Sequence, residues 1–160
     1  MGGIFLIRKV SRPEAITVTP VSSEVVRKFV DSYEDKRRLR SRLGSLERQV
    51  QRGKISRRRY RLRRSSLDGR LSRLQKDLTG LRTKIEAASS RHAEWMRQLE
   101  TAEAEIETLD RDIGRVDVRY RRREISAEAR RRLLDEYNRI KERAENRIAE
   151  ILLRLREEIR

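Results

Sequence analysis

The sequence has no cysteine, two prolines, seven glycines and few aromatic residues in its 160 positions. Without cysteine, disulfides, thiolate metal sites and thiol catalysis are excluded. With aromatic residues at 4% and hydrophobic residues at 36%, a large rounded core is not expected. No apolar run reaches the roughly 18 residues that a membrane span needs. The apolar start of the chain, residues 1–7, has no basic region before it and no long apolar core, so we expect no signal peptide and predict a cytoplasmic location.

Charge, by contrast, is abundant. Charged residues make up 42% of the chain and the formal net charge is +16. This basic excess indicates an anionic partner, which is a nucleic acid, an acidic lipid surface or an acidic stretch of another protein. Thirty-five of the 42 basic residues are arginine, whose planar guanidinium forms paired hydrogen bonds with phosphate or carboxylate.

The strongest pattern is a stripe of apolar residues spaced alternately by four and three positions. Fifteen of its sixteen positions are apolar, although only 36% of the chain is hydrophobic. A mean spacing of 3.5 residues is typical of a coiled-coil seam, because it keeps one face of a helix against a partner helix. The seam consists of Leu67, Leu71, Leu74, Leu78, Leu81, Ile85, Ala88, His92, Trp95, Leu99, Ala102, Ile106, Leu109, Ile113, Val116 and Tyr120.

Two breaks interrupt the helical pattern. The first is Arg52-Gly53-Lys54-Ile55-Ser56, and the second, Arg122-Arg123-Glu124-Ile125-Ser126, lies 70 residues later. Seventy residues are ten heptads, so the sequence predicts one helix–turn–helix unit used twice. Gly53, Ile55, Ser56, Ile125 and Ser126 are the predicted turn residues, with the serines as helix caps and the isoleucines packing on the last core layer.

These features predict an all-α fold, an elongated antiparallel coiled coil of three helices in the order short, long, short. The coiled-coil region is expected over residues 24–160, with helices at about 24–52, 56–122 and 126–160. The two short helices would fold back along the long one. The alternative is one nearly continuous helix that dimerises in parallel. Residues 1–23 are predicted to form a short β-like segment, because two β-prone stretches there are separated by glycine and proline.

Basic residues concentrate in the first half of this region. Residues 24–88 contain 21 basic and eight acidic residues, whereas residues 89–160 contain 18 and 17. A cluster directly after the first turn is the candidate contact for an anionic surface or a nucleic acid, although it would also serve to keep the molecules soluble and apart. This cluster, called the tip arginines below, consists of Arg57, Arg58, Arg59, Arg61, Arg63 and Arg64.

An acidic stretch follows in the balanced half, formed by Glu100, Glu103, Glu105, Glu107, Asp110 and Asp112. It could pair with the basic half of a neighbouring molecule and drive staggered assembly. Pairing inside the molecule and an ordinary solvated face are the alternatives.

The single histidine, His92, occupies a seam position, where a polar residue typically fixes register and partner number. Trp95 is expected to pack where the two short helices approach each other, or else to mark a dimer contact. No phosphate-binding loop, nucleophile motif or metal-ligand set is present, and a long coiled coil has little concave interior for a pocket. We therefore predict a protein that is not an enzyme, with no cofactor, no metal and no small-molecule substrate.

The helix lengths and the placement of the breaks resemble the coiled-coil region of the CdvA family of archaeal cell-division proteins. The likeness is carried by Arg52-Gly53-Lys54-Ile55-Ser56 with Tyr60, and by Arg123-Glu124-Ile125-Ser126, and covers residues 26–150. It implies a filament-forming cytoskeletal role at the inner membrane face or the nucleoid, affinity for DNA, and an ESCRT-III-like partner. The family also has an N-terminal β-barrel, which residues 1–23 are too short to form.

The sequence thus predicts a coiled-coil scaffold that forms homo-oligomers on an anionic surface, in archaeal cell division or membrane remodelling. The alternative is a nucleic-acid-binding module whose basic hairpin clamps a phosphate backbone, with DNA or RNA as the partner in place of an acidic membrane surface.

Overall fold

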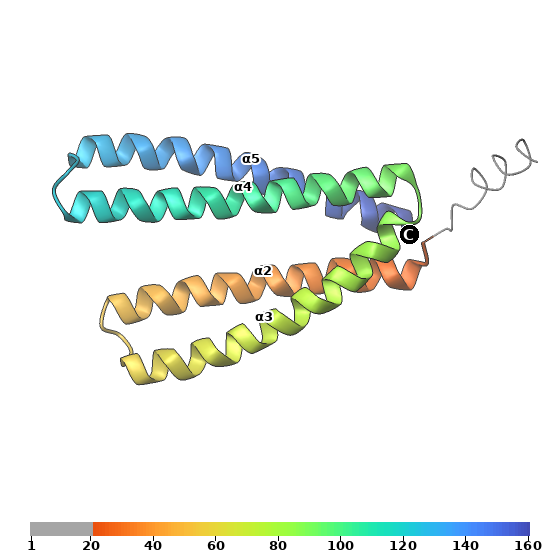
Figure 1. Ribbon diagram of the computed structural model, residues 1–160, viewed down its shortest axis with the longest axis horizontal. Coiled ribbons are helices and arrows are strands. Elements are labelled where there is room, and N and C mark those ends of the chain that lie inside the picture. The colour runs from red at the N-terminus through yellow and green to blue at the C-terminus, as the bar shows by residue number, and fades with distance from the viewer. Residues whose placement is uncertain (1–20) are drawn as a thin grey trace, which may run out of the picture. The chain divides into compact units, whose positions relative to one another are not determined.

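The computed structural model describes residues 21–160 and contains four helices in that range (Figure 1). These helices are α2 (Ser23–Gln51), α3 (Arg57–Glu86), α4 (Ser90–Arg121) and α5 (Ala127–Glu158). About 88% of the described residues are helical and none of them forms a strand. The predicted all-α class is confirmed. Within residues 21–160, none of the helices contains an uncharged apolar stretch of the length that a membrane span requires.

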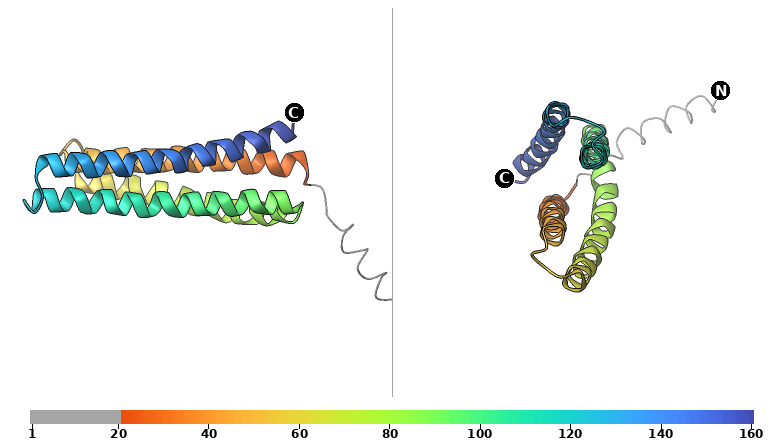
Figure 2. Two further views of the ribbon diagram at one scale, coloured as in Figure 1. Left: turned by 90° about the horizontal axis from the view of Figure 1, so that it is seen from above. Right: turned by 90° about the vertical axis from the view of Figure 1, so that its left-hand side faces the viewer.

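The helices form two antiparallel hairpins. In the first hairpin α2 runs back along α3, and Glu47 of α2 lies 3.8 Å from Arg64 of α3. In the second hairpin α4 runs back along α5, and Figure 2 shows each helix pair from two further directions. The chain divides into two compact units, residues 21–92 with Glu158–Arg160, and Ala93–Glu157. The fold-back arrangement is therefore correct, and the alternative of one nearly continuous helix is wrong.

The two turns repeat each other bond for bond. In the first, the amide N–H groups of Gly53 and Lys54 donate to the carbonyl oxygens of Val50 and Gln49, at 3.1 and 2.9 Å. In the second, those of Arg123 and Glu124 donate to Tyr120 and Arg119, at 3.0 and 2.9 Å. This pair of bonds is the Schellman motif, which ends a helix with one residue in the left-handed conformation. Gly53 has φ 71° and Arg123 has φ 59°.

A serine restarts the helix after each turn. The Ser56 Oγ accepts a hydrogen bond from the Arg59 amide at 3.2 Å, and the Ser126 Oγ accepts one from the Ala129 amide at 3.1 Å. A serine at this position satisfies an amide that the helix itself leaves unpaired. Ile55 and Ile125 lie next to these serines and are half-buried.

The prediction of three helices is wrong, because the expected long helix over 56–122 is two helices. α3 ends at Glu86, and the chain turns through Ala87 and Ala88 before α4 begins at Ser90. Ser89 accepts a hydrogen bond from the His92 amide at 3.1 Å, so a serine cap starts a new helix inside the seam. The seam spacing continues across the break, which is why the sequence pattern did not reveal it.

The predicted β-like segment over residues 1–23 is not supported. Residues 1–20 lie outside the described residues. In the remainder no strand is present, and Ser22 caps α2 by accepting a hydrogen bond from the Val25 amide at 3.2 Å.

The buried residues form stripes along the helices. In α2 they are Val26, Phe29, Val30, Tyr33, Lys36, Leu39 and Leu46, which lie on one face, as expected for the inner side of an amphipathic helix. The largest fully buried side chains include Phe29, Leu78, Ile85, Met96, Leu99 and Leu155.

Candidate polyanion-binding surface

The tip arginines occupy the first two turns of α3. Because Ser56 caps the helix, Arg57 is its first residue, and all six arginines are exposed. Successive residues of an α-helix point about 100° apart, so this cluster surrounds the helix instead of forming one basic face. Such a cluster offers guanidinium groups in several directions at the turn end of the first hairpin.

The local electrostatics of this helix end are unfavourable without a partner. The first turn of α3 has no acidic residue, although the positive end of the helix dipole favours one there. Of the six tip arginines only Arg64 has side-chain partners within residues 21–160. It donates to the Tyr60 hydroxyl at 2.6 Å, and its Nε lies 3.5 Å from Asp68. The hydrogen bond to Tyr60 raises the pKa of Arg64 further above its ordinary value.

The second hairpin shows which of these charges the fold itself needs. Since the two hairpins repeat at 70 residues, the positions equivalent to the tip arginines are Ala127, Glu128, Ala129, Arg131, Leu133 and Leu134. Only one of the six is an arginine, and one is acidic. α5 nevertheless starts with the same serine cap and follows the same turn. The arginine cluster is therefore not a requirement of the hairpin.

The seam residues lie mainly inside the molecule. Tyr120 is 41% exposed, and every other seam residue is buried or half-buried. The seam runs along α3 and α4, which the break at residues 87–89 separates. Trp95 is buried within the single chain.

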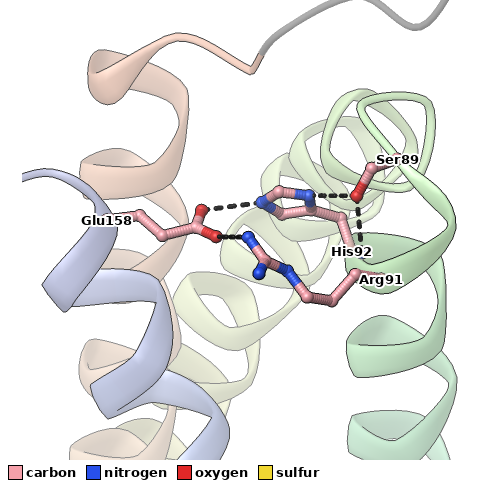
Figure 3. Close-up of polar contacts among 4 residues, drawn as sticks. All are labelled: Ser89, Arg91, His92 and Glu158. Atoms are coloured by element: carbon pink, nitrogen blue, oxygen red, sulfur yellow. Dashed lines mark hydrogen bonds and ion pairs between the residues drawn. The ribbon is translucent and has the colours of Figure 1, made fainter.

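His92 lies at the break, in a polar cluster that Figure 3 shows together with Ser89, Arg91 and Glu158. The His92 Nε2 is 2.7 Å from Glu158, and its Nδ1 is 2.6 Å from the Ser89 hydroxyl. Arg91 donates to the other carboxylate oxygen of Glu158 at 2.9 Å. Both ring nitrogens of this buried histidine have hydrogen-bond partners, which accounts for a polar residue in the seam. No group of acidic and histidine residues within 21–160 could hold a metal ion.

The acidic stretch is engaged within its own hairpin. Lys141 Nζ lies 2.7 Å from Asp110, and Arg147 lies 3.2 Å from Glu105, both across the α4–α5 interface. A third cross-helix pair joins Arg130 to Asp117 at 2.9 Å. These contacts favour pairing inside the molecule over assembly with a neighbour.

Sequence reasoning missed a second group of arginines on the first hairpin. Arg38 and Arg42 of α2 and Arg70 and Arg73 of α3 line one cleft. They come from two segments about 30 positions apart, so no contiguous signal marks them. The signal that could have found them is the spacing within each pair, four positions on α2 and three on α3. This spacing puts each pair on one face of its helix, and the predicted hairpin brings the two helices together.

The fold and its surface define a class: an all-helical coiled-coil protein built from two serine-capped hairpins, the first of which carries a large excess of basic over acidic residues. Among protein families, the model for "coiled-coil domain-containing protein 167" matches residues 94–160, which form most of the second hairpin. No curated protein matches the chain. The first hairpin, with its basic excess, lies outside the matched range.

The resemblance to the CdvA family is wrong, because the family model that does match is a different coiled-coil family. The likeness rested on helix lengths and break positions. Heptad spacing and Schellman turns produce these features in coiled coils of many functions. The archaeal division role and the ESCRT-III-like partner that the resemblance implied have no further support.

Proposed function

We propose that this protein is a non-enzymatic coiled-coil scaffold that binds a polyanionic partner through its first hairpin. The supporting observation is the contrast in charge between two hairpins of the same design. Residues 21–92 contain 22 basic and eight acidic residues, whereas residues 93–157 contain 16 of each. The second hairpin has the same design with balanced charges, so the fold does not need the excess of basic residues in the first hairpin. We therefore assign this excess to binding.

Self-association belongs to the same proposal and is assigned to the second hairpin. Two first hairpins repel each other strongly, because like charges at a shared interface are unfavourable. The second hairpin has no net charge over residues 93–157 and can meet another copy without that penalty. The protein would then join copies through one hairpin and hold the anionic partner with the other.

Binding of the full chain to duplex DNA, RNA and acidic vesicles, measured over a range of salt concentrations, tests the function. We expect binding that weakens steeply with salt, since each neutralised phosphate of B-DNA releases about 0.9 counterion. Neutral vesicles serve as the negative partner. Failure to bind any of the three anionic partners at low salt would contradict the proposal.

A matched pair of variants tests the position of the charges. In the first, glutamine replaces Arg57, Arg58, Arg59, Arg61 and Arg63. In the second, glutamine replaces Arg121, Arg122, Arg131, Arg139 and Arg143, which are exposed and lie in the second hairpin. Both lose five charges, but only the first should lose affinity by about tenfold or more and show a shallower salt dependence. Equal losses would mean that net charge alone governs binding.

A further inference from the structure

A cleft of about 390 Å³ lies between the two helices of the first hairpin. Four arginines line it, Arg38 and Arg42 from α2 and Arg70 and Arg73 from α3. Residues three or four apart share one face of a helix, so each helix presents a pair of guanidinium groups to the same space. Below, these four are called the cleft arginines.

Three of the cleft arginines have no partner in the described structure. Arg38 forms an ion pair with Asp35, and the hydrogen bond that Arg38 donates to the Asp35 carboxylate raises the pKa of Arg38. Within residues 21–160, no hydrogen bond or ion pair engages the side chains of Arg42, Arg70 or Arg73. The four positive charges around this space exceed the two negative charges of Asp35 and Asp77, which also line it.

Leucines and aspartates complete the cleft. Leu39 is buried and Leu74 half-buried, and both line the cleft. Asp35 and Asp77 also line it, one from each helix. The equivalent residues of the second hairpin are Glu105 and Arg147, which form an ion pair at 3.2 Å. The first hairpin therefore has two acidic residues where the second closes the helix pair with opposite charges.

The second hairpin again shows what the fold does not require. Thr108, Asp112, Ile140 and Arg143 take the places of the four cleft arginines in order. One arginine is shared and three are not. The three extra guanidinium groups are thus a property of the first hairpin alone, as the tip arginines are.

We propose that this cleft binds the phosphate backbone of a double-stranded nucleic acid, continuously with the tip arginines. The inference rests on the proposed function, since it names the polyanion that the first hairpin binds and where. Arg57 and Arg73 are sixteen residues apart on α3, which is about 24 Å along a helix. A basic track of this length matches a row of phosphates on a polymer, not a single phosphate group.

A lipid surface fits the arrangement less well. A membrane is a plane, whereas the tip arginines surround their helix and the cleft arginines face a space between two helices. Helices that bind membranes insert an exposed apolar face. On α3, Leu62 is the one large hydrophobic side chain that is strongly exposed, at 66%.

The aromatic residues indicate duplex binding without sequence preference. Proteins that bind single strands stack bases on exposed aromatic rings. In the first hairpin Phe29 and Tyr33 are buried, and the guanidinium of Arg64 lies 5.8 Å above the half-buried ring of Tyr60. The described part of this hairpin offers no free ring for stacking, so phosphates are the contacts available to it.

The test uses the full chain and two triple variants that each lose three charges from the first hairpin. The cleft variant is Arg42→Gln, Arg70→Gln and Arg73→Gln. The control variant is Arg27→Gln, Arg37→Gln and Arg48→Gln, at exposed positions that do not line the cleft. Affinity for a 20-base-pair DNA of mixed sequence is measured by fluorescence anisotropy at several salt concentrations.

We expect the cleft variant to lose affinity by about tenfold or more and its salt slope to fall by about 2.7, for three phosphates at 0.9 each. The control variant should lose less than about threefold and keep its slope. Equal losses in the two variants, with wild-type binding intact, would overturn the cleft assignment and leave the proposed function standing. If the wild type binds neither duplex DNA, RNA nor acidic vesicles, the proposed function fails with it. A preference for acidic vesicles over duplex would overturn the nucleic-acid assignment alone.

A second measurement does not depend on how the variants fold. Phenylglyoxal modifies exposed arginines of the wild type, and mass spectrometry reports the extent at each one. Bound duplex should protect Arg42, Arg70 and Arg73 and leave Arg27 and Arg37 reactive. Protection of all five to the same degree would contradict a defined track.

Discussion

At the scale of single residues, one position shows how much a side chain constrains the backbone. Gly53 and Arg123 take the same place in equivalent turns, with φ 71° and 59°. Glycine adopts this conformation freely. In any other residue the Cβ comes too close to the backbone, which costs about 1–2 kcal/mol of conformational energy. The second turn keeps its geometry because its two Schellman hydrogen bonds and the serine cap are in place.

Replacing Arg123 with glycine should therefore stabilise the protein by about 1 kcal/mol, because it removes that conformational cost. Replacing Gly53 with alanine should destabilise it by a similar amount. No atom lies within 4 Å of a Cβ built at Gly53, so a steric clash would not be the cause. Urea unfolding of the full chain measures both effects.

The control for the glycine is another glycine-to-alanine change. Gly69 lies inside α3, also with open space around an added Cβ, and has helical backbone angles. Alanine there should stabilise the helix by up to about 1 kcal/mol. If Gly53→Ala and Gly69→Ala shift stability in the same direction, the argument from the left-handed conformation is wrong.

At the scale of helices, one hydroxyl group caps the start of α4 after the break. Ser89 Oγ accepts from the His92 amide and also contacts the His92 ring. Ser89→Ala should destabilise the protein by about 1 kcal/mol through loss of the cap. The neighbouring change Ser90→Ala is the control, because Ser90 is exposed and already helical. Thermal unfolding compares them, and equal melting temperatures would contradict the role of Ser89.

The turns make a second prediction at this scale. Ile55 is half-buried, and Ile55→Asp should fray the first turn by placing a charge where an apolar side chain packs. The free energy of unfolding should fall by up to about 1.5 kcal/mol, which is the lower end of the range for full burial of such a side chain. Hydrogen exchange should rise at residues 48–60. Lys54→Asp, on an exposed neighbour, should leave exchange there nearly unchanged.

The sequence predicted the hairpins because their signals are local. In the first turn a glycine allows the left-handed residue that ends the helix, and in both turns a serine caps the helix that follows. The break at residues 87–89 was missed because Ile85, Ala88 and His92 keep the seam spacing. This spacing indicates which face of a helix is buried, but not whether the helix is continuous. The cleft was missed for another reason: Arg42 and Arg70 meet only after α2 folds back on α3, whereas the tip arginines are contiguous.

At the scale of the whole molecule, charge is distributed unequally over two similar hairpins. The first can take part in assembly only when its charge is screened or neutralised, because copies of it repel. In the second, Glu105, Asp110 and Asp117 are engaged across the hairpin itself. Staggered assembly between acidic and basic halves would weaken as salt rises. Assembly through the neutral hairpin would strengthen, because salt removes only repulsion.

Sedimentation of the full chain at low and high salt distinguishes these two modes of assembly, because self-association changes with salt in opposite directions in the two. The screening length falls from about 10 Å at 0.1 M salt to about 3 Å at 1 M. We therefore expect self-association to increase over that range.

The variant with glutamine at Arg57, Arg58, Arg59, Arg61 and Arg63 has five fewer charges to screen, so it should associate at lower salt than the wild type. A short duplex should have the same effect as salt, since it neutralises the first hairpin directly. Association that decreases with salt would instead support pairing of opposite charges between molecules, and a monomer under every condition would remove the scaffold from the proposal.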